Sequence, residues 1–143
     1  MSRNLFYLLL LFFLTGSCTG QKNAPASDLA NGTDYRLNDI WVLENINGKA
    51  INVQTEPPRL EFQLKENRVT GYGGCNQISG SIQTTEKTIQ FGMMARTKMA
   101  CPDLALEDQF LGYLNDQEVG FEIGERKLTL TSGNNRLVFK KVD

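Results

Sequence analysis

The sequence predicts a β-rich α+β domain in which short antiparallel strands make up most of the structure and one segment is helical. Apolar and polar residues alternate with a period of two in most segments after residue 38, which is typical of strands with one face in a core. Turn-forming residues, such as the Asn47-Gly48 pair, separate these segments. Helical spacing of apolar residues occurs between residues 102 and 117.

The alternating segments predict six strands before the helical segment. They are expected at residues 40–46, 49–52, 60–64, 68–72, 78–84 and 87–91. Asn47-Gly48 is a strong hairpin signal, and further turns are expected at residues 66–67 and 85–86. Each alternating side is therefore expected to face a core.

The helix is expected to begin at Pro102, because the first helical position tolerates a residue without an N–H group. Asp103 places a negative charge at the positive end of the helix dipole. Leu106, Phe110 and Leu114 recur at helical offsets, so the helix is expected to end near residue 115 or 117. Three further strands are expected after it, at residues 119–123, 127–131 and 136–142.

Residues 1–17 have the features of a bacterial lipoprotein signal peptide. Arg3 is their only charged residue, and the apolar run 5–14 is shorter than the roughly 20 residues that a membrane-spanning helix needs. Cys18 follows small residues, and its thiol would carry the lipid. We therefore expect a protein anchored in the cell envelope, in the outer membrane because Thr19 follows the cysteine. An ordinary secretory signal cut nearby is the alternative.

Residues 18–37 are small and polar, and they predict a flexible tether with a reach of roughly 24 Å. Residues 38–143 are then expected to form one domain, which we expect to be monomeric.

Three cysteines in an oxidising compartment leave one thiol over. If Cys18 is acylated, Cys75 and Cys101 form the remaining pair, and a disulfide between them would stabilise the fold by roughly 3 to 4 kcal/mol. A redox-active pair is the alternative interpretation. No metal site is expected, because two cysteines without histidine do not make a zinc site.

The chain has no histidine, which removes the commonest general base and the commonest metal ligand. We therefore expect neither an enzyme nor a bound cofactor. Fifteen basic and 16 acidic residues give a net charge of −1 without a basic tract, so nucleic acid is not an expected partner.

Two sequence blocks stand out, Val-Thr-Gly-Tyr-Gly-Gly-Cys-Asn at 69–76 and Met-Ala-Arg-Thr-Lys-Met-Ala-Cys-Pro at 94–102. In these blocks the chain resembles the META (HslJ-like) domain family, and the resemblance runs from about residue 37 to the end. The family-motif residues are Gly71, Gly74, Cys75, Asn76, Gly80, Thr97, Met99, Cys101 and Pro102. The resemblance implies a small, partly open barrel-like sheet with one packed helix. It also implies an envelope protein linked to heat shock, drug resistance or virulence, without an established catalytic site.

Several residues have both a functional and a structural interpretation, and we favour the structural one for each. Asp103, Glu107 and Asp108 are expected to be solvated charges at the helix start rather than a metal or acid–base cluster. Met93, Met94 and Met99 are expected to fill the core or cover strand edges rather than line an apolar groove.

The motif glycines are expected to let the chain approach the helical segment closely, while Asn76 tolerates a left-handed backbone. Trp41 and Tyr72 are expected in the core or at the barrel rim.

Together these features predict a membrane-anchored, non-enzymatic envelope lipoprotein with a stress-linked binding or accessory role. Its expected partner is an envelope protein or an apolar ligand. Two alternatives remain open: a thiol-dependent or redox protein that uses Cys75 and Cys101, and a protease inhibitor that presents the loop from Gly71 to Asn76.

Overall fold

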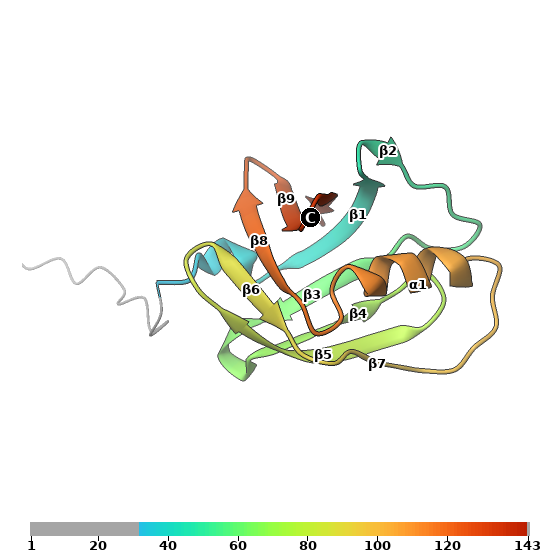
Figure 1. Ribbon diagram of the computed structural model, residues 1–143, viewed down its shortest axis with the longest axis horizontal. Coiled ribbons are helices and arrows are strands. Elements are labelled where there is room, and N and C mark those ends of the chain that lie inside the picture. The colour runs from blue at the N-terminus through green and yellow to red at the C-terminus, as the bar shows by residue number, and fades with distance from the viewer. Residues whose placement is uncertain (1–31, 143) are drawn as a thin grey trace, which may run out of the picture.

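The computed structural model describes residues 32–142, in which eight antiparallel strands form a ring and one helix lies at its end (Figure 1). Around the ring the strands are β1 (Ile40–Ile46), β3 (Arg59–Gln63), β4 (Arg68–Tyr72), β5 (Gln77–Thr84), β6 (Thr88–Phe91), β8 (Glu118–Ile123), β9 (Lys127–Ser132) and β10 (Asn135–Lys141). Two short strands lie outside the ring: β2 (Lys49–Ala50) pairs with β1, and β7 (Ala95–Arg96) pairs with β5.

The barrel is closed, so the partly open sheet that the family resemblance implied is wrong. β10 pairs with β1 along most of its length, from Trp41 opposite Lys141 to Ile46 opposite Leu137. A β-bulge between Leu43 and Asn45 interrupts the register of this pair, and bulges of this kind increase the local bend of a strand. The first and last strands of the ring therefore protect each other's edges.

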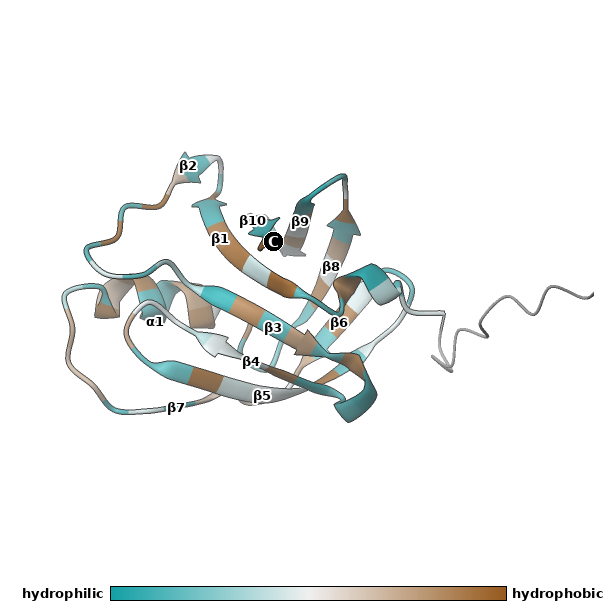
Figure 2. Cartoon of the chain, turned by 180° about the vertical axis from the view of Figure 1, so that it is seen from behind, coloured by the Kyte–Doolittle hydropathy of each residue, from teal (hydrophilic) through white to brown (hydrophobic). Residues whose placement is uncertain are grey.

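The alternation read from the sequence corresponds to the inner and outer faces of the barrel. In β3, Leu60 and Phe62 are buried while their neighbours are partly exposed, and Figure 2 shows the same alternation of hydrophobic and hydrophilic residues along this strand. The large side chains that are completely or almost completely buried are Trp41, Phe62, Phe91, Phe110, Phe139, Leu37, Leu43, Leu60, Ile82, Ile89, Leu114 and Leu128. The core thus fills the barrel interior.

Local turn chemistry sets the strand connections. Asn47 and Gly48 both have positive φ, 53° and 77°, as a tight hairpin between β1 and β2 requires. Asn67 has φ 49° and ends a short 3₁₀ helix, η2 (Leu64–Glu66), before β4 begins. The strands expected from the alternation are present, although β2 is shorter than predicted and β7 was not predicted.

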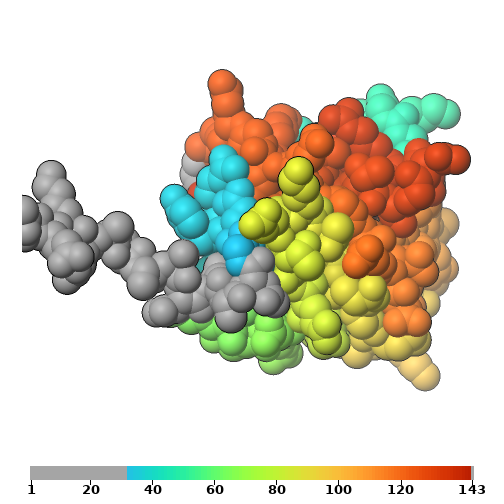
Figure 3. Space-filling view, turned by 60° about the vertical axis from the view of Figure 1, so that its left-hand side comes forward, coloured from blue at the N-terminus to red at the C-terminus, as the bar shows by residue number. Residues whose placement is uncertain are grey.

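The folded part of the chain begins earlier than the boundary expected at residue 38. A 3₁₀ helix, η1 (Tyr35–Leu37), buries Leu37 completely, and Trp41 Nε1 donates a hydrogen bond to the Leu37 carbonyl at 3.0 Å. The Thr33 and Thr84 hydroxyls lie 2.9 Å apart, and Figure 3 shows the N-terminal segment beside the β5–β6 hairpin. The predicted signal peptide, Cys18 and most of the predicted tether lie outside the described residues.

The helix, α1 (Leu104–Gly112), covers the end of the barrel next to the β1–β2 turn and the β4–β5 loop (Figure 1). Phe110 is fully buried, and its ring centroid lies 6.2 Å from that of Phe139 on β10. The helix begins after Asp103, later than predicted, and ends at Gly112, earlier than predicted; Asp103 is its N-cap residue, and the Asp103 side chain bonds to the loop after β2 and not to the helix. Within residues 32–142, no helix has the length and apolar character needed to cross a membrane.

Candidate functional site

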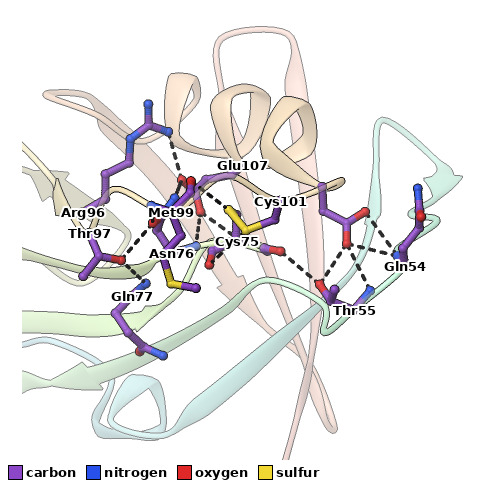
Figure 4. The surroundings of a disulfide bond; sticks show 12 residues. Gln54, Thr55, Cys75, Asn76, Gln77, Arg96, Thr97, Met99, Cys101 and Glu107 are labelled. Carbon is purple, nitrogen blue, oxygen red and sulfur yellow. Dashed lines mark hydrogen bonds and ion pairs between the residues drawn. A yellow bond between two sulfur atoms is a disulfide. The ribbon is translucent and has the colours of Figure 1, made fainter.

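Cys75 and Cys101, the predicted pair, are joined by a disulfide in the structure (Figure 4). Their Cα atoms lie 5.7 Å apart, and 26 positions separate them in the sequence. Cys75 belongs to the β4–β5 loop and is 2% exposed, whereas Cys101 lies just before α1 and is partly exposed. The bond therefore holds the loop against the start of the helix.

Glu107 is a completely buried carboxylate beside this disulfide. Its Oε2 accepts hydrogen bonds from the backbone N–H groups of Cys75 at 3.1 Å and Asn76 at 2.6 Å. Its Oε1 accepts from Asn76 Nδ2 at 2.8 Å and from Arg96 Nη1 at 2.9 Å. A buried charge is tolerated where it is paired and hydrogen bonded in this way.

Asn76 connects Glu107 to the segment after β7, as Figure 4 shows. Its Oδ1 accepts hydrogen bonds from Thr97 Oγ1 at 2.9 Å and from the Met99 backbone N–H at 2.7 Å. Its own carbonyl accepts from Gly73 N at 2.8 Å. Asn76 does not belong to the positive-φ residues of the described chain, so its amide side chain, and not a left-handed backbone, explains why asparagine is needed here.

Two glycines make room for this cluster. A Cβ atom on Gly73 would lie 2.6 Å from Glu107 Oε2, closer than real Cβ contacts come. Gly74 has φ +110°, which side chains of L-residues rarely adopt. The expected close approach to the helical segment is therefore present, and the atoms that approach are those of the buried carboxylate.

Asp103 is a second buried carboxylate, 6% exposed, at the start of α1. It accepts hydrogen bonds from the backbone N–H groups of Gln54 and Thr55 and from Thr55 Oγ1, the last at 2.9 Å. Burial raises the pKa of Asp103, but the bonds from the Thr55 hydroxyl and the two N–H groups outweigh it and hold the pKa below its usual value. Asp103 thus fixes the loop after β2 to the helix.

The expectation of solvated charges at the helix start is wrong for Asp103 and Glu107. It is right for Asp108, whose side chain is 56% exposed and forms an ion pair with Arg96 at 2.6 Å. The spacing along the helix could have indicated that Glu107 is buried. Glu107 lies three positions before Phe110, and residues three apart lie on the same face of a helix; Phe110 is fully buried, so this face points inward.

The remaining motif residues have packing roles. A Cβ on Gly71 would lie 2.0 Å from the Arg59 carbonyl oxygen, and one on Gly80 would lie 2.4 Å from Met94 Sδ. Met94 is buried, as the core-filling interpretation expected. Pro102 occupies a turn directly before the helix, and not its first position.

Two methionines of the same segment are exposed, Met93 to 71% and Met99 to 62%. Met99 joins the cluster through its backbone, whose N–H donates to Asn76 Oδ1 and whose carbonyl oxygen lies 3.4 Å from Cys75 Sγ. Trp41 lies in the core as expected, and Tyr72 lies at the barrel surface with the Arg59 guanidinium 5.5 Å from its ring centroid.

Chemically, this cluster is suited to holding three segments together. In the described part of the chain, no group of three or more histidine, cysteine, aspartate or glutamate residues could hold a metal ion. Each buried carboxylate accepts several hydrogen bonds from the protein, and no buried side-chain nitrogen or oxygen within these residues lacks a partner. We call the disulfide, Asn76 and Glu107 the clamp.

These features define a small closed barrel whose end is covered by a helix and fastened by the clamp. The chain belongs to the META domain family, whose model matches residues 35–143. It is 26% identical over 105 residues to the heat shock protein HslJ of Escherichia coli (strain K12), covering 72% of this chain and 74% of that protein. Neither the name of the family nor the name of this relative designates an enzyme.

Solved structures share the fold. A protein from Burkholderia xenovorans, solved by NMR, is 26% identical with a TM-score of 0.60, covering 86% of this chain and 96% of its own. A second NMR structure has 24% identity and a TM-score of 0.60, covering 73% of this chain and 90% of its own, and supports the fold alone.

Proposed function

We propose that this protein is a lipid-anchored module of the cell envelope, in the outer membrane, that has a stress-related, non-enzymatic binding or accessory role. Membership of the META domain family and similarity to a protein named for heat shock support the link to stress. The apolar run before Cys18 supports export and lipid attachment.

The disulfide between Cys75 and Cys101 is the observation that carries this proposal. Disulfides persist in oxidising compartments and are rare where thiols are kept reduced. With these two cysteines paired in the folded domain, Cys18 is the one cysteine left over, and it stands at the predicted cleavage site. Acylation of Cys18 would account for the odd number of cysteines in the chain.

A hollow in the surface beside α1 supports a binding role for an apolar group. It has a volume of about 340 Å³ and lies between the β1–β2 hairpin and α1. Ile46, Ile51 and Leu106 contribute apolar surface, while Asn52 and Gln109 belong to the polar part of the lining. An apolar side chain of an envelope protein, or a small apolar ligand, fits this composition.

The structure favours a binding role over the two alternatives. A redox role needs an accessible sulfur; Cys75 is 2% exposed, so Cys101, which is partly exposed, is the one sulfur of the pair that a thiol could reach. An inhibitor must present its loop, and Gly73, Gly74 and Asn76 are buried beneath α1. The loop is therefore not available to a protease.

The first test is the intact mass of the protein from the membrane fraction, compared with a Cys18→Ser variant. We expect diacyl or triacyl mass on the native chain, and loss of both that mass and membrane association in the variant. Alkylation should reach Cys75 and Cys101 only after strong reduction. A native protein without acyl chains would contradict the anchor, and a pair that opens in mild reductant would favour the redox alternative.

The second test concerns the role in stress. A strain lacking the protein should lose viability on heating, and the native chain should restore it while Cys18→Ser restores less. A strain that survives envelope stresses as well as its parent would contradict the proposed role.

A further inference from the structure

The outer face of the barrel carries a polar groove that the clamp does not use. It has a volume of about 450 Å³ and crosses β3, β4, β5 and β7. Strand register places Glu61 opposite Thr70, Thr70 opposite Ser79, and Ser79 opposite Ala95. Thr70, Ser79 and Ala95 have short side chains, so they form the bottom of the groove between rows of longer side chains. We call these three residues the floor of the groove.

Arginine side chains stand on both sides of this floor. Arg59 lies in the neighbouring row, opposite Tyr72, with its guanidinium 5.5 Å from the ring centroid and its Nη1 3.0 Å from Glu56 Oε2. These contacts orient Arg59 in advance. Arg68 lies in the row on the other side, opposite Ser81, and in the described part of the chain its side chain has no ion pair.

The floor also has unused hydrogen-bonding capacity. The side-chain hydroxyls of Thr70 and Ser79 form no hydrogen bond with other described residues. Gln77 lies on β5, opposite Tyr72 of β4, and adds an exposed side-chain amide to the lining. A hydroxyl and an amide each offer both donor and acceptor atoms, which is what polyhydroxyl ligands require.

The charge of the groove favours an anion. Three of the six arginines of the described chain line it, against one carboxylate, Glu61, although the protein as a whole has a net charge of −1. The Arg96 guanidinium is bound to Glu107 and Asp108, and the Arg59 guanidinium is paired with Glu56, an exposed carboxylate that does not line the groove, so Arg68 supplies the positive charge of the lining that has no ion pair within the described residues.

We propose that this groove binds a saccharide unit that carries one phosphate or carboxylate group. The guanidinium of Arg68 takes the anion, since arginine recognises phosphate and carboxylate groups with paired hydrogen bonds, and Arg59, which is held by Glu56, contributes its remaining N–H groups. The hydroxyls of Thr70 and Ser79 and the amide of Gln77 meet the sugar hydroxyls. A volume of about 450 Å³ is within the range of small-ligand sites. The inference rests on the proposed binding role, and it is independent of the lipid anchor.

The test is calorimetric titration of the purified mature protein with glucose 6-phosphate, glucuronate, glucose and inorganic phosphate. We expect the two acidic sugars to bind more tightly than glucose or phosphate, with affinity falling as salt is added. In ¹⁵N–¹H spectra, the amide shifts should be confined to β3, β4, β5 and β7. Equal affinity for inorganic phosphate would overturn the saccharide, and no binding of either acidic sugar would overturn the site.

Three variants test the geometry. Arg68→Gln should weaken binding about tenfold or more, because it removes a charged hydrogen-bonding group. Glu61→Gln should strengthen binding, because it removes the carboxylate beside the anion. Arg136→Gln, on β10 and outside the groove, is the matched control and should bind as the native protein does. Arg68 is exposed, so an unchanged melting temperature verifies the fold.

If Arg68→Gln and Arg136→Gln change the affinity for the acidic sugars equally, the assignment of the binding site to this groove is overturned. An acylated native protein that binds neither acidic sugar contradicts this inference alone, whereas a native protein from the membrane fraction that binds the acidic sugars but carries no acyl chains contradicts the anchor alone.

Discussion

Two hydrogen bonds join Asn76 and Glu107 across 31 positions of sequence: the backbone N–H of Asn76 donates to Oε2 at 2.6 Å, and Nδ2 donates to Oε1 at 2.8 Å. They connect the β4–β5 loop to α1, which are also the elements that the disulfide connects. The helix is thus attached to the barrel by two independent links, one covalent and one polar.

Replacing Glu107 by glutamine should destabilise the protein by about 2–4 kcal/mol, the range expected when a buried polar network loses a charged partner. Each oxygen of Glu107 accepts two hydrogen bonds, so an amide NH₂ at either position would face two donors. Urea unfolding under oxidising conditions measures the effect. Asp108→Asn is the exposed neighbour and should change the unfolding free energy by less than about 0.5 kcal/mol. A similar loss in both variants would contradict the special role of Glu107.

Removing the disulfide by Cys75→Ala together with Cys101→Ala should cost about 3 kcal/mol, from the loop that the bond closes. The variant should still fold, because Asn76 and Glu107 continue to hold α1. Thermal unfolding with and without reductant measures both points. Reductant should lower the melting temperature of the native protein and leave that of the variant unchanged. A variant without a cooperative transition would show that the polar link alone is insufficient.

Two Gly→Ala substitutions should have opposite effects. A methyl group on Gly73 would lie 2.6 Å from Glu107 Oε2, so Gly73→Ala should destabilise the fold and disturb the clamp. Gly112 ends α1, and a methyl group there would have nothing within 4 Å, so Gly112→Ala should stabilise by up to about 1 kcal/mol. Chemical denaturation of the two variants in parallel provides the comparison. If alanine at position 73 and alanine at position 112 change the free energy of unfolding equally, the close approach of Glu107 to Gly73 is contradicted.

Asp103 should contribute to stability in a pH-dependent way. Its pKa is lowered in the folded protein, so its contribution is present above the unfolded pKa of about 3.9 and is lost as pH falls through the lower folded pKa. Asp103→Asn should therefore be less stable than the native protein at pH 7, by a difference that stays constant down to about pH 5 and shrinks below about pH 4. Urea unfolding across this range measures it.

Asp34 and Asp39 also have lowered pKa values. The hydrogen bond with Arg36 lowers the pKa of Asp34; burial raises the pKa of Asp39, but the hydrogen bonds from Lys141 and from the Ile40 N–H outweigh it. Because the native protein and Asp103→Asn both contain Asp34 and Asp39, the contributions of these two residues cancel in the difference between the two free energies of unfolding. A difference that grows on acidification would show that Asp103 favours its protonated form in the fold.

Most strands were predictable because each has one face in the core. β1 and β4 have the bounds that the alternation indicated. β7 escaped prediction because Ala95 and Arg96 are both exposed and show no alternation. Closure of the barrel was also missed, since it depends on the tilt and stagger of all eight strands together, which no single segment encodes.

The clamp was predictable in part. The count of cysteines predicts the pairing of Cys75 with Cys101, whereas the rarity of buried carboxylates predicts that Glu107 is a surface charge, although it is completely buried. Its spacing from Phe110 indicated the inward face of the helix, but only the structure reveals the backbone N–H groups that make burial of the charge acceptable.

Pairing of the first strand of the ring with the last has a consequence for how the protein is made. A chain synthesised from its N-terminus cannot complete the barrel until the seven residues of β10 have left the ribosome. A chain that stops between β9 and β10 leaves the edges of β1 and β9 open together, and open edges invite pairing with other chains. Closure of the barrel therefore waits until β10 has been made, and a chain interrupted before that strand keeps open edges at which it can aggregate.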